Sequence, residues 1–130
     1  MTLEDYQNRA MTTCLPPSEN TAYMLLNLVG EIGEFCSNVA KHIRKEEMTF
    51  SGEQNPNELA YTDKIGNLPE ADSALEKEAG DILWQLSGLC TVMGWSLEKV
   101  AEHNLEKLAA RKQAGTIAGS GDGISGEGRK

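Results

Sequence analysis

The sequence contains little that would place the protein outside the cell or in a membrane. Its 130 residues include only three cysteines, Cys14, Cys36 and Cys90, and no CxxC pair. This scattered set predicts neither a disulfide framework nor a zinc site. The longest uncharged run, Ile82 to Leu97, has 16 residues, whereas a membrane-spanning helix needs roughly 20 predominantly apolar ones. Acidic residues precede the first apolar stretch, which argues against a secretory signal, and we therefore expect a cytoplasmic protein.

Positive charge is also scarce. The chain has 12 Lys and Arg against 20 Asp and Glu, for a formal net charge of −8. Such an acidic chain is not expected to bind nucleic acid or an anionic membrane non-specifically. A phosphate-bearing substrate remains compatible with this charge if bound divalent cations neutralise it. With 39% hydrophobic and 25% charged residues, the composition is typical of a single globular domain.

No segment of the chain requires a β-strand. Apolar residues recur every three or four positions, which predicts helices rather than strands. We expect a helix at 3–12, a second from a cap at Ser18 or Asn20 to 45, and a third from a cap at Asp72 or Ser73 to 93, where Gly94 ends it. A fourth helix at 97–113 is expected to follow a cap at Ser96. Turn-forming residues at 48–71 predict a long connection with one helical turn near 58–61. The expected fold is an all-α bundle of four main helices, whose core is completed by oligomerisation.

The C-terminal end of the chain is rich in glycine. Residues 114–130 contain six glycines and almost nothing apolar, so burial cannot offset the entropy lost on ordering them. We expect one domain over residues 1–117 and a flexible glycine-rich tail over residues 118–130.

The third predicted helix has a second face that indicates burial. Gly80, Trp84, Ser87 and Thr91 recur at helical spacing opposite the leucine and isoleucine stripe. Four helices of this size cannot easily bury both sides of one helix, so this face favours coverage by a partner subunit. The alternative is a partly exposed tryptophan, which is common.

Two pairs of carboxylates carry the strongest chemical signal. Glu31 and Glu34 form one pair, Glu78 and Asp81 form the other, and no other acidic residues in the chain are three apart. Members of each pair lie one turn apart and border the apolar stripe, where like charges repel and lose hydration. Four carboxylates on two packed helices are unfavourable unless divalent cations bind there. Oxygen ligands favour Mg²⁺ or Mn²⁺, and the Glu-x-x-His motif of di-iron bundles is absent.

A set of polar and basic residues on the fourth predicted helix complements the carboxylates. Asn104, Lys107 and Arg111 share one face, with Asn104 inside the apolar stripe. Lys41, two turns beyond Glu34, adds a possible cation. An ordinary solvated helix end would explain Arg111 by itself, but not the asparagine with two basic neighbours. Carboxylates beside basic groups are typical of phosphate-processing sites.

These segments resemble a known family. The stretches NLVGEIGE (27–34), EAGDILW (78–84) and NLEKLAAR (104–111), with LEDYQ (3–7) and GSGD (119–122), are similar to the MazG-like nucleoside triphosphate pyrophosphohydrolases. The resemblance implies an all-α enzyme that uses Mg²⁺, with Mn²⁺ able to substitute, to hydrolyse (deoxy)nucleoside triphosphates to monophosphate and pyrophosphate. It implies a role in nucleotide-pool control or sanitation, and assembly as a homodimer or dimer of dimers.

The resemblance also implies roles for individual residues. The metal ligands would be Glu31, Glu34, Glu78 and Asp81, with Glu31 and Glu34 as catalytic carboxylates and Glu31 as the candidate base. The substrate contacts would be Lys41, Asn104, Lys107 and Arg111. The 43 residues between Glu34 and Glu78 exceed those of compact members of the family. The base and sugar preferences stay open.

Two other functions remain to be weighed. One is a catalytically inactive helical-bundle interaction protein, although such a bundle gains nothing from four converging carboxylates. The other is a different carboxylate–metal enzyme, which the missing Glu-x-x-His motif disfavours.

Overall fold

The computed structural model describes residues 1–50, 59–62 and 64–117. Within them the chain forms four α-helices, one 3₁₀ helix and a two-stranded sheet, which confirms the all-α class apart from the sheet. The elements are α1 (Leu3–Met11), η1 (Pro16–Ser18), α2 (Thr21–Arg44), β1 (Met48–Phe50), β2 (Leu59–Tyr61), α3 (Leu68–Val92) and α4 (Leu97–Ala114). The predicted tail at 118–130 lies outside the described residues, so the proposed domain boundary stays a prediction.

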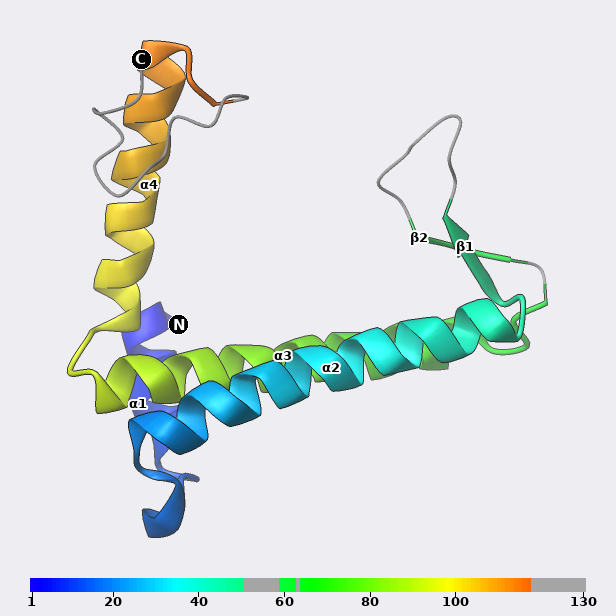
Figure 1. Ribbon diagram of the computed structural model, residues 1–130, viewed down its shortest axis with the longest axis horizontal. Helices are drawn as coiled ribbons and strands as arrows, with labels where there is room; N and C mark the ends of the chain where they lie inside the picture. The colour runs from blue at the N-terminus through cyan, green and yellow to red at the C-terminus, as the bar shows by residue number, and fades with distance from the viewer. Residues whose placement is uncertain (51–58, 63, 118–130) are drawn as a thin grey trace.

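The two longest helices form the main body of the structure. Helices α2 and α3 lie side by side as an antiparallel hairpin, and α1 packs across α3 near one end of it (Figure 1). The small sheet lies at the opposite end. Helix α4 packs against α1 and extends away from the hairpin (Figure 1). The monomer is therefore elongated rather than a closed four-helix bundle.

Most helices begin and end at the residues that the sequence predicted. The Asn20 side chain accepts a hydrogen bond from the Tyr23 N–H at 2.8 Å and starts α2, and Ser96 caps α4 by accepting from the Lys99 N–H at 3.3 Å. Gly94 follows α3 with a φ of 73°, a conformation that costs glycine little. These boundaries confirm the sequence analysis.

The start of α3 was predicted too late. Helix α3 begins at Leu68, not after the expected caps at Asp72 or Ser73. Pro69 occupies its first turn, where the missing N–H has no helical acceptor to lose and the fixed φ already suits a helix. The sequence analysis read this proline as part of a turn.

The connection after α2 contains a β-hairpin, which corrects the expectation of no strand and of a helical turn at 58–61. Strands β1 and β2 pair antiparallel, with Met48 opposite Tyr61. Met48 is 4% exposed and packs with Val39 and Leu75 in a small core. Strands of three residues are too short to show clear alternation, which is why periodicity missed them.

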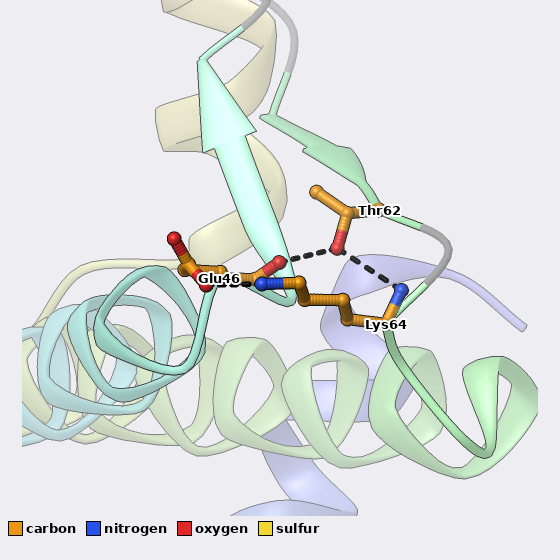
Figure 2. A network of polar contacts seen from close by, with 3 residues as sticks. All are labelled: Glu46, Thr62 and Lys64. Atoms are coloured by element: carbon orange, nitrogen blue, oxygen red, sulfur yellow. Dashed lines mark hydrogen bonds and ion pairs between the residues drawn. The ribbon is translucent and has the colours of Figure 1, made fainter.

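Polar contacts join the two segments that flank this hairpin, one between α2 and β1 and the other between β2 and α3. The Thr62 hydroxyl donates to the main-chain oxygen of Glu46, and the Lys64 ammonium pairs with the Glu46 carboxylate (Figure 2). Glu46 itself has a φ of 60°, so it turns the chain sharply between α2 and β1. These contacts fix where the long connection leaves and rejoins the helical hairpin.

Helix α1 covers the part of the second face of α3 around Trp84 and Ser87, which the sequence analysis assigned to a partner subunit, while Gly80 and Thr91 on the same face stay exposed in the single chain. The Trp84 indole N–H donates to the Ala10 carbonyl oxygen at 3.2 Å and lies 2.9 Å from the Thr13 hydroxyl oxygen. Ser87 is fully buried on this face. Because α1 is only nine residues long, the sequence analysis underestimated how much of α3 it could cover.

Gln7 of α1 is a buried polar link between three elements. Its amide nitrogen donates to the Thr91 hydroxyl at 3.0 Å and to the Trp95 carbonyl at 2.9 Å. Its amide oxygen accepts from the Leu97 N–H at 2.7 Å. Gln7 therefore holds α1 against the turn that joins α3 to α4.

We expect Gln7→Leu to lower the free energy of unfolding by about 1–3 kcal/mol, because it leaves the buried Leu97 N–H without its acceptor. Urea denaturation measures this change. The matched control is Asn8→Leu, at an exposed position on the same helix, which should shift stability by no more than about 0.5 kcal/mol. Equal effects from the two substitutions would contradict the role given to Gln7.

Most of the predicted core stripe of α2 is exposed in the single chain. Leu25 is 49%, Val29 70% and Ile32 45% exposed, and Cys36 is also exposed. On α4, Leu97 is buried but Leu105 is 66% exposed. The predicted inward faces of α2 and α4 are thus largely unpartnered, because α4 does not pack onto the hairpin.

Two glycines on α3 are expected to respond oppositely to alanine. A Cβ at Gly88 would clash with the sulfur of Met24, whereas one at Gly80 meets nothing within 4 Å. Met24 is fully buried, so Gly88→Ala forces the flexible end of its side chain to move and should destabilise the protein by about 1 kcal/mol through overpacking. Gly80→Ala should stabilise it by about 0.5–1 kcal/mol through helix propensity. Thermal unfolding of both variants measures the difference, and a stabilising Gly88→Ala would contradict this packing.

Candidate metal centre

Three of the four predicted carboxylates meet between α2 and α3. Glu31 from α2 and Glu78 and Asp81 from α3 each offer one oxygen, and these oxygens all lie within 4.8 Å of one another. Glu31 and Glu78 are half-buried and Asp81 is exposed. The cluster therefore lies at the edge of the helix–helix seam, where water and ligands can reach one side.

Two asparagines of α2 hold these carboxylates in place. The Asn27 amide donates to Oε1 of Glu31, and the Asn38 amide donates to Oε1 of Glu78, each at 3.2 Å. The sequence analysis did not name either asparagine as a site residue. The available signal was spacing, since Asn27 lies four residues before Glu31 and Asn38 seven residues after it, on the same helical face.

The unsatisfied atoms of the cluster suit a cation. Oε2 of Glu78 is buried and has no hydrogen-bond partner among the described residues. A buried carboxylate oxygen without a partner is costly unless a cation or another group binds it. The donor set consists of oxygen atoms alone, which suits Mg²⁺ or Mn²⁺. The residues present therefore fit a hard divalent metal ion.

The pKa of Glu31 reflects the same crowding of charge. Burial raises this pKa above its usual value, and the negative charges of Glu34 and Asp81 raise it further. The hydrogen bond from Asn27 acts in the opposite direction by stabilising the carboxylate. The negative charge of Glu31 is therefore costly in this site, and a bound cation would reduce that cost.

Glu34 lies beside this cluster rather than in it. It is exposed and is not among the three residues whose oxygens converge. It is nevertheless close enough for its charge to raise the pKa of Glu31. Its assignment as a ligand or catalytic group stays a prediction.

The predicted substrate contacts are not brought to the carboxylates within one chain. Asn104, Lys107 and Arg111 are on α4, which extends away from the α2–α3 hairpin (Figure 1). Asn104 and Lys107 are exposed, and Arg111 is half-buried. Lys41 is exposed near the end of α2 and forms no ion pair within the described part of the chain.

Comparison with known proteins assigns the chain to a family. The model of the MazG nucleotide pyrophosphohydrolase domain matches residues 19–116, a span that includes all four predicted carboxylates. A relative from Mycobacterium phage L5, named Gene 37 protein, is 30% identical over 129 residues, covering 94% of this chain and 98% of that protein. No solved structure gave a significant match. Across the described residues, no helix is both long enough and apolar enough to cross a membrane. The chain belongs to the MazG nucleotide pyrophosphohydrolase domain family.

Proposed function

We propose that this protein hydrolyses (deoxy)nucleoside triphosphates to monophosphate and pyrophosphate in an Mg²⁺-dependent reaction. The observation that carries the proposal is the convergence of Glu31, Glu78 and Asp81, whose carboxylate oxygens lie within 4.8 Å of one another. A cytoplasmic role in control or sanitation of the nucleotide pool agrees with this reaction. An inactive interaction protein would have no use for such a costly cluster.

The carboxylates have distinct roles in this proposal. Glu31, Glu78 and Asp81 hold the metal ion, and Glu34 supplies a fourth carboxylate one turn after Glu31. When bound, Mg²⁺, or Mn²⁺ in its place, neutralises charge on the phosphate oxygens and lowers the pKa of a water molecule. Glu31 is also our candidate for orienting the attacking water, because the hydrogen bond from Asn27 fixes one of its oxygens.

The substrate site is completed by assembly. The exposed apolar side chains of α2, with Val29 at 70%, are typical of an oligomer interface. We propose a homodimer or dimer of dimers in which α2 and α4 bury these surfaces. Assembly would also bring Asn104, Lys107 and Arg111 of α4, with Lys41 of α2, to the phosphates that the carboxylates hold.

Thermal unfolding with and without Mg²⁺ tests the metal site directly. A ligand at 100 times its Kd stabilises the folded state by about 2.7 kcal/mol, so the midpoint of the wild-type protein should rise with Mg²⁺. The shift should be lost in Asp81→Asn and retained in Glu70→Gln, an exposed acidic residue in the first turn of α3. A wild-type midpoint that does not respond to Mg²⁺ would contradict the metal site and favour an inactive interaction protein.

A further inference from the structure

A cavity that none of the four carboxylates lines is not used by the reaction described above. Its volume is about 480 Å³, within the roughly 300–1,000 Å³ typical of small-molecule sites. It lies where the end of α1, the segment before α2, the start of α2 and the end of α3 meet. The lining residues that matter here are Met11, Cys14, Glu19, Met24, Gly88 and Thr91.

The spacing between this cavity and the carboxylates matches the length of a nucleoside. Met24 is seven residues before Glu31 on α2, and Gly88 is seven residues after Asp81 on α3. Seven residues are about two helical turns, or roughly 10 Å, and bring the chain back to the same face. Because the helices are antiparallel, both steps lead toward the same end of the hairpin. A nucleotide with its phosphates at the carboxylates can therefore place its base in the cavity.

The polar side chains of the cavity are mostly committed to the fold. The Thr91 hydroxyl donates to the Ser87 carbonyl at 2.9 Å and accepts from Gln7 at 3.0 Å. The Asn20 side chain is used to cap α2. Glu19 differs, since it is an exposed lining residue whose side chain forms no ion pair or hydrogen bond with the other described residues. It lies close enough to Cys14 for its charge to add to the effect of burial in raising the pKa of that thiol.

A free carboxylate selects for hydrogen-bond donors. An ionised carboxylate only accepts, and its two oxygens can accept from two neighbouring N–H groups at once. Among the common bases, guanine presents such a pair on one edge, the ring N1–H and the 2-amino group. Uracil and thymine present one N–H between two carbonyl oxygens, which a carboxylate repels. Met11 and Met24 supply adaptable apolar surface for the faces of a ring.

We propose that this cavity is the base-binding subsite and that Glu19 makes it selective for guanine nucleotides. The proposal rests on the proposed function, because it assumes that the phosphates bind at Glu31, Glu78 and Asp81. Glu19 is then a specificity-determining residue that takes no part in the chemical step.

Comparison of closely matched substrates tests this role. Hypoxanthine lacks only the 2-amino group of guanine, so the ratio of kcat/KM for GTP over ITP isolates the second hydrogen bond. In the wild-type protein GTP should exceed ITP, and both should exceed UTP, with GTP over UTP by roughly 10- to 100-fold. Glu19→Gln should bring the GTP/ITP ratio close to one, while Glu70→Gln should leave it unchanged. An unchanged ratio in Glu19→Gln, or a wild-type preference for UTP, would overturn the proposal.

A second measurement does not depend on turnover. Cys14 lines the cavity, so the rate of its alkylation reports whether the cavity is occupied. GMP should slow alkylation of Cys14 by iodoacetamide, as located by mass spectrometry, more than UMP at the same concentration, and this difference should be lost in Glu19→Gln. Equal protection by GMP and UMP, or none, would overturn the subsite. Selective protection by GMP without hydrolysis of any triphosphate would support the subsite and contradict the proposed reaction alone.

Discussion

Replacing Glu78 with glutamine is expected to reduce Mg²⁺-dependent pyrophosphate release by at least about 100-fold. Glutamine keeps the shape of the side chain and leaves an oxygen that can still accept from Asn38. It removes the charge of a carboxylate whose second oxygen is buried without a partner. Loss of that charge should weaken metal binding more than it disturbs packing.

The same substitution should not destabilise the metal-free protein. Removing one of three converging negative charges relieves repulsion, and the new amide N–H can donate to a neighbouring carboxylate. The free energy of unfolding in EDTA should therefore stay level or rise, while Glu70→Gln should change neither stability nor turnover. A Glu78→Gln protein with near-normal turnover would show that these carboxylates do not form the metal site.

Introducing a charge on the exposed face of α2 should dissociate the oligomer and abolish most of the activity. Val29 is 70% exposed in the single chain, so Val29→Asp should leave the fold of the monomer intact. In an assembled interface the same carboxylate would be buried without a partner, which costs several kcal/mol. Turnover should fall at least about 10-fold at protein concentrations where the variant is monomeric, because α4 would no longer complete the substrate site.

Sedimentation and circular dichroism together measure this outcome. The wild-type protein should sediment as a dimer or tetramer and Val29→Asp as a folded monomer. Asn8→Asp, a new charge at an exposed position on α1, should leave the assembly unchanged. An active wild-type monomer would contradict the role that we assign to assembly.

The sequence predicted helices well and tertiary contacts less well. Asn20 and Ser96 identified the starts of α2 and α4, because capping depends on residues close in the chain. The face of α3 around Trp84 and Ser87 is buried as expected, but within the single chain its cover is α1, and Gly80 and Thr91 of the same face stay exposed. Which element covers a face depends on the path of the connecting segment, which periodicity does not describe.

The candidate site could also be predicted from the sequence only in part. Spacing brought Glu78 and Asp81 together on one helix and placed Glu31 at the facing seam, and their convergence is what the structure displays. It could have revealed Asn27, which lies four residues before Glu31, but the acceptor of Asn38 is Glu78 on α3, and spacing along α2 does not identify that partner. The position of Arg111 far along α4 depends on how α4 leaves α3, which no local pattern determines.

Analysis of the products formed in ¹⁸O-labelled water tests the central claim most directly. The wild-type protein, incubated with Mg²⁺ and GTP, should release GMP and pyrophosphate, with one bond between the α and β phosphates broken per turnover. The products and the position of the label can be read by mass spectrometry, with the same reaction in EDTA as the control. Our account predicts GMP and pyrophosphate only when Mg²⁺ is present. Release of GDP and orthophosphate, or equal turnover in EDTA, would contradict it.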